Sequence, residues 1–200
     1  MPHELCLNKT ILLPDWISKF LEESPNSYAA ADDRMRFAIE LSRQNVIHKT
    51  GGPFGAAIFE SASGKLVSVG VNIVVQSSAS IAHAEIVAMT LAQEALGTFD
   101  LGAPNFPAHE LITSAQMCSM CFGASCWSGV TRIVYAATRA DAEQIAGFDE
   151  GPLPTAWEIE LAKRGIEIIQ STLRSEAQEV LALYAKSEGT IYNSQRTPLG

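Results

Sequence analysis

Hydrophobic and polar positions follow two different patterns along the first half of the chain. Apolar residues recur at helical spacing up to about His48, with Asp32 or Asp33 placed to cap the helix, and Gly51-Gly52-Pro53 ends it. Two apolar runs follow, at 55–59 and 66–75, and the Ser-Ala-Ser-Gly segment between them is typical of a β-hairpin. The pattern therefore predicts a helix followed by the first two strands of a sheet.

The second half alternates between strands and helices. Residues 82–96 are apolar almost all round, as in a helix packed between other elements, and Gly97 ends this helix. We expect strands at 110–114, 132–137 and 166–170, and helices at 118–128, 140–146, 156–164 and 173–186. Such alternation favours parallel pairing, so we predict an α/β fold: a three-layer α-β-α sandwich with a mixed five-stranded sheet.

Composition agrees with one ordinary domain. The chain has 200 residues, 47% of them hydrophobic and 18% charged, and a domain of that size buries enough surface to fold without disulfides. We expect a single domain over residues 1–200, with an N-terminal arm over about 1–30 and a C-terminal tail over about 188–200.

Charge and the N-terminal sequence exclude some partners. The net charge is −8 and the basic residues are scattered, so nucleic acid is disfavoured as a partner. The apolar stretch Ile11-Leu12-Leu13 is interrupted by Pro14 and Asp15, which argues against a signal peptide or a membrane span. We therefore expect a cytoplasmic protein that does not bind membranes.

Four residues stand at the starts of two predicted helices. Cys118 and Cys121 are three positions apart, so both sulfurs can face one point on a helix. We expect adjacent parallel strands to lead into the two helices and to place their starts side by side. The His83 imidazole then completes three corners of a tetrahedral Zn²⁺ site and leaves the fourth for water, as in catalytic zinc sites. Glu85 can move protons for a hydrolysis, provided that the helix begins near His83, because residues two apart diverge by about 200° within a helix.

Simpler interpretations exist for each of these residues. The cysteines alone could form a redox pair or pack as small hydrophobic groups, and Cys126 could complete a structural site with four ligands. The joint presence of His83 and Glu85 favours zinc, and the position of Cys126 on the helix turns it away from the other two. We interpret Cys126 and Cys6 as packing residues, and His3, His48 and His109 as surface residues.

The same residues resemble a known signature. His83-Ala84-Glu85 followed by Cys118-Ser119-Met120-Cys121 is similar to the H-x-E and P-C-x-x-C signature of the cytidine deaminase superfamily. The resemblance extends over about 51–151, and Gly51-Gly52-Pro53-Phe54-Gly55, Gly70-Val71-Asn72 and Gly147-Phe148-Asp149-Glu150 resemble the bacterial guanine deaminase branch. It implies a cytidine deaminase-like fold and hydrolytic deamination of an amino-substituted heterocyclic base, most of all guanine, with an aminotriazine such as ammeline as a second substrate.

The resemblance also implies contacts with a substrate. Phe54 would stack on the base, Asn72 would bond its ring edge, and Trp127 would form a wall, although Phe54 and Trp127 also fit as core aromatics and Asn72 as a turn residue. Asp149 and Glu150 would accept hydrogen bonds from the amino and ring N–H groups, and Tyr192 would belong to a C-terminal lid. The alternatives are a solvated acidic loop and a frayed end. A homodimer is implied by the resemblance alone.

One departure from the family pattern keeps other functions open. Gln116-Met117 stands where the family usually has Glu-Pro, and proline there would fix the entry to the ligand helix. Its absence is expected to loosen that turn without removing a ligand. The alternatives are a deaminase of cytosine, a nucleoside or tRNA adenosine, and a non-catalytic zinc-stabilised binding module.

Overall fold

In a computed structural model that describes residues 8–192, the chain forms one mixed sheet of five strands. The strands are β1 (Gly55–Glu60), β2 (Leu66–Val71), β3 (His109–Ala115), β4 (Arg132–Ala137) and β5 (Glu167–Ile169). They lie in the order β2-β1-β3-β4-β5, where β1 is antiparallel to both β2 and β3, and β3, β4 and β5 are parallel. The predicted hairpin and the mixed five-stranded sheet are confirmed.

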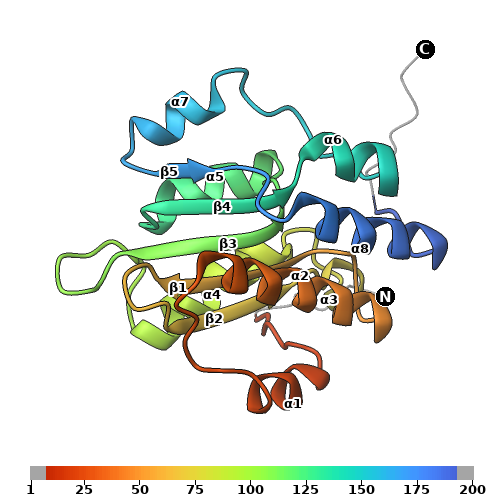
Figure 1. Ribbon diagram of the computed structural model, residues 1–200, viewed down its shortest axis with the longest axis horizontal. Helices are drawn as coiled ribbons and strands as arrows, with labels where there is room; N and C mark the ends of the chain where they lie inside the picture. Colours follow the sequence, from red (N-terminus) through yellow and green to blue (C-terminus); the bar gives the residue numbers. More distant parts are fainter. Residues whose placement is uncertain (1–7, 193–200) are drawn as a thin grey trace, which may run out of the picture.

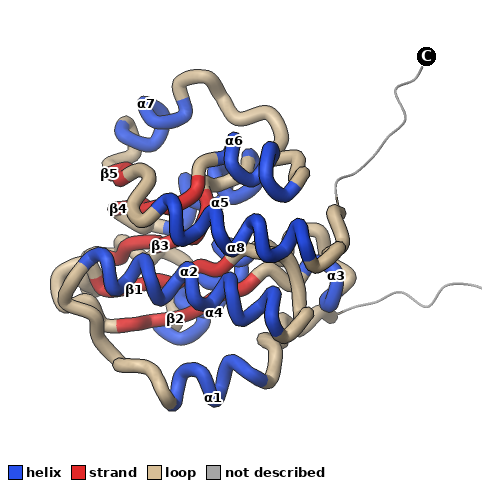
Figure 2. The backbone as a smooth tube through the Cα atoms, turned by 45° about the vertical axis from the view of Figure 1, so that its right-hand side comes forward, coloured by secondary structure: helices blue, strands red, loops and turns tan. Residues whose placement is uncertain are grey.

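Helices cover both faces of this sheet (Figures 1 and 2). One layer holds α2 (Ala31–Ile47) and α8 (Arg174–Lys186), and the other holds α4 (Ala84–Leu96) and α5 (Ser119–Ser128). The central strands β1 and β3 are buried along nearly their whole length, because side chains on both of their faces meet a helical layer. The shorter elements are α1 (Trp16–Glu22), α3 (Val74–Ser77), α6 (Arg139–Asp141), the π-helical turn η1 (Ala142–Ala146) and α7 (Trp157–Ala162).

The topology brings the starts of α4 and α5 to the same end of the sheet. Strands β2 and β3 both pair antiparallel with β1, so they run in the same direction and leave the sheet at the same end. We expected adjacent parallel strands to lead into the two helices, and this detail is wrong, because β1 lies between them. The shared direction, rather than adjacency, places the two helix starts together.

The N-terminal part of the chain differs from the expected arm and cap. The arm contains α1, whose Phe20 packs on Phe37 of α2 at 5.4 Å between ring centroids. Helix α2 begins at Ala31, after an extended Ala30 with no side-chain cap. Asp32 and Asp33 lie in its first turn, where carboxylates favour the positive end of the helix dipole without capping it.

Two further expectations need correction, and two lie outside the described residues. His109 is fully buried rather than exposed, and its Nδ1 lies 2.7 Å from the carbonyl oxygen of Leu101, a partner that no local pattern indicates. The helix expected at 140–146 is α6 followed by a π-helical turn. His3 and Cys6 fall within residues 1–7, so their predicted roles stay untested.

The helices of the described region are too short or too polar to span a lipid bilayer.

Candidate active site

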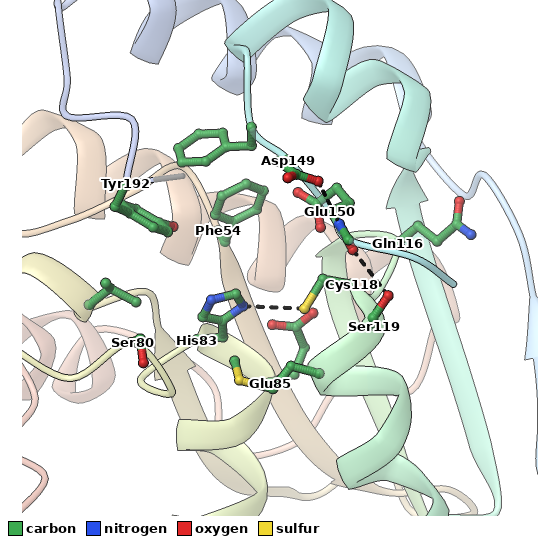
Figure 3. A pocket seen from close by; sticks show the side chains of 14 residues that line it. Phe54, Ser80, His83, Glu85, Gln116, Cys118, Ser119, Asp149, Glu150 and Tyr192 are labelled. Atoms are coloured by element: carbon green, nitrogen blue, oxygen red, sulfur yellow. Dashed lines mark hydrogen bonds between the residues drawn. The ribbon is translucent and has the colours of Figure 1, made fainter. Parts of the chain in front are cut away.

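The three predicted zinc ligands meet at the two helix starts, and Figure 3 shows two of them, His83 and Cys118. His83 is the N-cap of α4 and Cys118 is the N-cap of α5, both with extended backbone, and Cys121 follows in the first turn of α5. The His83 Nδ1 atom lies 3.5 Å from Cys118 Sγ and 3.7 Å from Cys121 Sγ. All three donor atoms lie within 4.8 Å of one another, so they face one point.

These distances fit a zinc ion. With Zn–S and Zn–N bonds of ordinary length at tetrahedral angles, the nitrogen and sulfur atoms stand about 3.6 Å apart. One imidazole and two thiolates are a donor set that zinc prefers, and three protein ligands leave a fourth position open. Among the described residues Cys126 does not join this group, which removes the argument for a closed structural site.

The two thiols differ in acidity. A hydrogen bond from the Cys121 side chain lowers the pKa of Cys118 to about 4, with His83 contributing in the same direction. The same hydrogen bond, together with burial, raises the pKa of Cys121 well above its ordinary value. One thiolate thus forms readily, and a bound cation would stabilise the second.

Glu85 lies beside the ligands, in the first turn of α4. His83 keeps an extended conformation with ψ of 154°, and the helix begins at Ala84, so the predicted helix start near His83 is confirmed. The Glu85 side chain lines the same pocket as His83 and Cys118. Burial, followed by the negative charge of Cys118, raises the pKa of Glu85 to about 7. A carboxyl group that titrates near neutrality is suited to accepting and returning protons.

A pocket of about 340 Å³ opens in front of these residues. Its volume is within the range of small-molecule sites. It is lined by Phe54, Val74, Ser80, His83, Glu85, Gln116, Cys118, Ser119, Met120, Phe148, Asp149, Glu150, Gly151 and Tyr192. The structure therefore brings the zinc ligands and Glu85 together with four of the six residues predicted to contact a substrate.

Aromatic side chains form one side of the pocket. The rings of Phe54 and Phe148 are 5.0 Å apart, and those of Phe148 and Tyr192 are 5.1 Å apart. Phe148 has no role predicted from sequence, although it stands in the Gly147–Glu150 segment that carries the resemblance. The rings meet edge-on and tilted, at interplanar angles of 68° and 53°, and together they give the pocket an apolar wall.

The acidic loop is tied to the ligand helix. The backbone N–H of Ser119 donates to the carbonyl oxygen of Glu150 at 3.1 Å, directly after the ligand Cys118. Glu150 is 8% exposed, and burial, followed by the charges of Cys118 and Glu85, raises its pKa to about 8. Asp149 is exposed, and its Oδ1 accepts a hydrogen bond from the Gly151 N–H at 2.9 Å. Of the two acidic residues, Glu150 is the one whose side chain is buried at the site.

Asn72 lies one layer behind the pocket surface. A Cβ built on Gly52 would be 3.0 Å from the Tyr192 hydroxyl and 3.4 Å from Asn72 Oδ1, so the two side chains lie around the same glycine. Asn72 Oδ1 accepts from the Val74 N–H at 3.3 Å. Within the described residues, the Asn72 Nδ2 and the Tyr192 hydroxyl are buried without hydrogen-bond partners. In this conformation Tyr192 covers the Asn72 side chain.

Trp127 is not at this site. Its side chain is 85% exposed, and it borders a separate depression with Ile86 and Met89 on the outer side of α4 and α5. Both the predicted pocket wall and the alternative of a core aromatic are therefore contradicted. Local spacing places Trp127 on α5 but does not show which face of that helix the sheet covers.

The segment before Cys118 is held on both sides. The Gln116 N–H donates to the Ala137 carbonyl oxygen at 2.8 Å, and its Oε1 accepts from the Arg139 N–H at 3.1 Å. Met117 is 1% exposed, and the Ser125 hydroxyl lies 3.4 Å from its sulfur. Hydrogen bonds and a buried side chain thus hold this turn where proline would restrict the backbone.

Comparison with known proteins places this geometry in a family. Residues 29–137 match the model of the cytidine and deoxycytidylate deaminase zinc-binding region. Guanine deaminase from Bacillus subtilis (strain 168) is 34% identical over 139 residues, which are 70% of this chain and 84% of that protein. The members of this family are zinc-dependent hydrolytic deaminases.

Solved structures agree over most of the chain. The guanine deaminase from Nitrosomonas europaea is 44% identical with a TM-score of 0.86, covering 92% of this chain and all of that one. A protein called NE0047, in complex with 2,6-diaminopurine, is 47% identical with a TM-score of 0.85, covering 92% of this chain and 96% of that one. The chain therefore belongs to the cytidine and deoxycytidylate deaminase family of zinc-dependent enzymes.

Proposed function

We propose that this enzyme hydrolyses guanine to xanthine and ammonia. One observation carries the proposal: the buried Glu150 carboxyl group shares a pocket of about 340 Å³ with Glu85 and the zinc ligands. Guanine presents an amino group and ring N–H groups along one edge, and a carboxylate accepts hydrogen bonds from such donors. A zinc ion bound to Cys118 would favour the ionised form of Glu150, because the charge of Cys118 is, after burial, a cause of its raised pKa. The similar proteins named as guanine deaminases support the same substrate.

Each residue then has a defined task. His83, Cys118 and Cys121 would hold zinc, which when bound activates water as a nucleophile near neutral pH. Glu85 accepts a proton from the attacking water, protonates the adjacent ring nitrogen and delivers a proton to the leaving amine. Guanine and water thereby become xanthine and ammonia, with the bond between the ring carbon and its amino nitrogen broken.

The remaining residues hold the base. Glu150 orients the edge that carries the amino group, while Phe54 and Phe148 contact the flat ring. Asp149 accepts a hydrogen bond from the Gly151 N–H and so holds the turn that carries Glu150. Tyr192 covers the pocket, and Asn72 reaches an acceptor on the base when the Tyr192 side chain moves aside.

Further parts of the proposal concern the setting of the enzyme. Ammeline is proposed as a second substrate, because it also presents amino groups on a flat ring. A reducing cytoplasm suits the free thiols of Cys118 and Cys121. Assembly as a homodimer is proposed as well, and sedimentation of the purified protein measures it.

Ammonia release from the zinc-loaded protein tests the substrate. The panel contains guanine, guanosine, ammeline, adenine, cytosine and cytidine, and the zinc-free protein is the control. We expect ammonia from guanine, with xanthine formed in equal amount. Release from adenine or cytosine without release from guanine contradicts the proposal, as does no release at all from folded protein with zinc bound.

The role of Glu150 is tested separately. Glu150→Gln keeps the shape of the side chain but replaces one acceptor with a donor, so we expect a KM for guanine at least about tenfold higher, as for a lost hydrogen bond to a charged group. An unchanged KM would assign Glu150 to the loop structure alone.

A further inference from the structure

A chain of hydrogen bonds runs from the N-terminal helix to two backbone segments behind the pocket. The Trp16 indole Nε1–H donates to the Thr50 hydroxyl at 3.0 Å, and that hydroxyl donates to Asn45 Oδ1 at 2.6 Å. The Asn45 Nδ2 group then donates to two backbone carbonyl oxygens, Gly52 at 2.8 Å and Asn72 at 2.9 Å. Asn45 itself is fully buried, in the last part of α2.

The chemistry of its ends gives this chain a single direction. An indole N–H can only donate, and a backbone carbonyl oxygen can only accept. Thr50 therefore receives from Trp16 and gives to Asn45, which leaves both Asn45 N–H groups for the two carbonyls. Turning the Asn45 amide over would place its oxygen against those carbonyls and leave the Thr50 proton only the Asn45 backbone carbonyl oxygen, at 3.4 Å. Opposed oxygen atoms at the fully buried Asn45 side chain would be costly.

The two carbonyls belong to the segments that carry the proposed base contacts. The Gly52 carbonyl also accepts from the Phe54 N–H at 2.8 Å, and the Asn72 N–H donates to the Phe54 carbonyl at 3.1 Å. A Cβ on Gly51 would lie 1.8 Å from the Asn72 carbonyl oxygen, so the two segments approach as closely as glycine permits. Asn45 thus joins the segment before β1 to the segment after β2, directly behind Phe54 and Tyr192.

We propose that Asn45 is a positioning residue for substrate binding, oriented through Thr50 by Trp16, and that helix α1 thereby takes part in forming the pocket. The inference rests on the proposed function. Asn45 touches neither the zinc ligands nor Glu85, which stand on α4 and α5, so its effect falls on binding rather than on proton transfer. Trp16 lies before residues 29–137, so the chain of hydrogen bonds starts outside the region that the family model matches.

Variants of Thr50 test the chain with little change of shape. Thr50→Val removes the hydroxyl and keeps the branched side chain, whereas Thr50→Ser keeps the hydroxyl. For Thr50→Val we expect a KM for guanine about fivefold higher, as for the loss of one neutral hydrogen bond, with kcat and zinc content unchanged. For Thr50→Ser we expect KM to return to within about twofold of the parent value.

A matched control is available at the other end of the sheet. Thr131 is more exposed than Thr50, but its hydroxyl likewise makes a partly buried hydrogen bond, donating to the His109 carbonyl oxygen at 3.2 Å. Thr131→Val loses one hydroxyl hydrogen bond without touching the pocket, so it shows what a general loss of stability does to KM. If Thr50→Val and Thr131→Val leave KM equally unchanged, or if Thr50→Val lowers kcat alone, the proposal is wrong.

Hydrogen exchange separates failure of this inference from failure of the proposed function. The indole Nε1–H of Trp16, followed by NMR, is expected to exchange at least about fivefold faster in Thr50→Val than in the parent or in Thr131→Val. This readout needs no substrate, so it reports on the hydrogen-bond chain even if guanine is not deaminated. If the exchange rate of the Trp16 indole is the same in Thr50→Val as in the parent, the proposed chain of hydrogen bonds is wrong. If Thr50→Val does not fold, Thr50→Ala replaces it, because Thr50 borders an open surface cavity that water can enter.

Discussion

At the scale of single residues, the site contains groups that must be in different protonation states. The zinc ligands require deprotonated thiols, while Glu85 requires a pKa near neutrality, and burial close to Cys118 produces the second condition. Two helix N-termini add partial positive charge where the thiolates stand. The environment of the site thus favours ionised sulfurs on the cysteines and a Glu85 carboxyl group that can both take up and release a proton.

Glu85→Gln is expected to lower kcat by about 10²- to 10⁴-fold with zinc retained, because the amide cannot carry the proton. Ammonia release and metal analysis of the same preparation measure the two effects. Glu94→Gln, an exposed position on the same helix, is the control and should leave kcat unchanged. Zinc loss in Glu85→Gln would show instead that the side chain supports the metal site.

The residues of the site differ in how far sequence could predict them. His83, Glu85, Cys118 and Cys121 could be found because their spacing within each helix is part of the chemistry. Phe148 and Trp127 could not be assigned in this way, because their positions depend on which layer each segment faces. Phe148 is 4% exposed, whereas Trp127 is 85% exposed, and no local spacing distinguishes them.

At the scale of elements, the metal site depends on how closely α4 approaches the sheet. A Cβ on Gly70 of β2 would lie 2.1 Å from the Ala84 carbonyl oxygen and 2.6 Å from the Ala88 N–H nitrogen. Because Ala84 follows His83 directly, the lack of a side chain at Gly70 lets the start of α4, with the ligand His83, pack closely against β2. The packing of small residues here fixes where the imidazole stands.

Gly70→Ala is expected to weaken zinc binding and to lower the thermal midpoint, because α4 must move away from β2. The measurements are competition with a chromophoric chelator and thermal unfolding. Gly123→Ala is the control on α5, where an added Cβ meets nothing within 4 Å, and replacing a helical glycine should stabilise by about 0.5–1 kcal/mol. Equal zinc affinity in both variants would contradict this role of the β2–α4 contact.

Most elements could be predicted from apolar periodicity, and the failures have physical causes. Helix α1 is short and follows Pro14, so its stability comes from contacts such as Phe20 on Phe37 rather than from its own pattern. The π-helical turn at Ala142–Ala146 departs from the regular helical period by which residues 140–146 were predicted. Strand order also depends on pairing between distant segments, which is why the place of β1 was missed.

At the scale of the whole molecule, one buried carboxylate connects the second half of the fold. Asp141 accepts hydrogen bonds from Arg174 Nε and Nη2 and from Gln178 Nε2, each at 2.8 Å. Thr138 adds two more, from its N–H and its hydroxyl. This network joins α6 and η1 to α8, and it holds the pKa of Asp141 well below its ordinary value, with Arg174 as the largest cause.

Asp141→Asn is expected to destabilise the protein at pH 7 but to matter little in acid. Because the folded pKa lies below the unfolded value of about 3.9, the carboxylate stabilises the fold above that value and loses its effect as the pH falls towards the folded pKa. Thermal midpoints of the parent and variant, measured from pH 7 down to about pH 2, should converge below about pH 4. Glu179→Gln, which changes an exposed carboxylate on α8, is the control, and a constant difference across the range would contradict the prediction.

The division of the pocket between helix starts and loops has a consequence for how such enzymes diverge. The ligands and Glu85 stand at helix starts set by the sheet, whereas Phe54, Phe148, Glu150 and Tyr192 stand on connecting segments. Loops accept substitutions and insertions more readily than packed elements. New base preferences can therefore evolve by changes in the loops while the hydrolytic machinery is inherited unchanged. A library for engineering this enzyme belongs at Phe54 and in residues 148–150, whereas Gly51 has no room for a side chain.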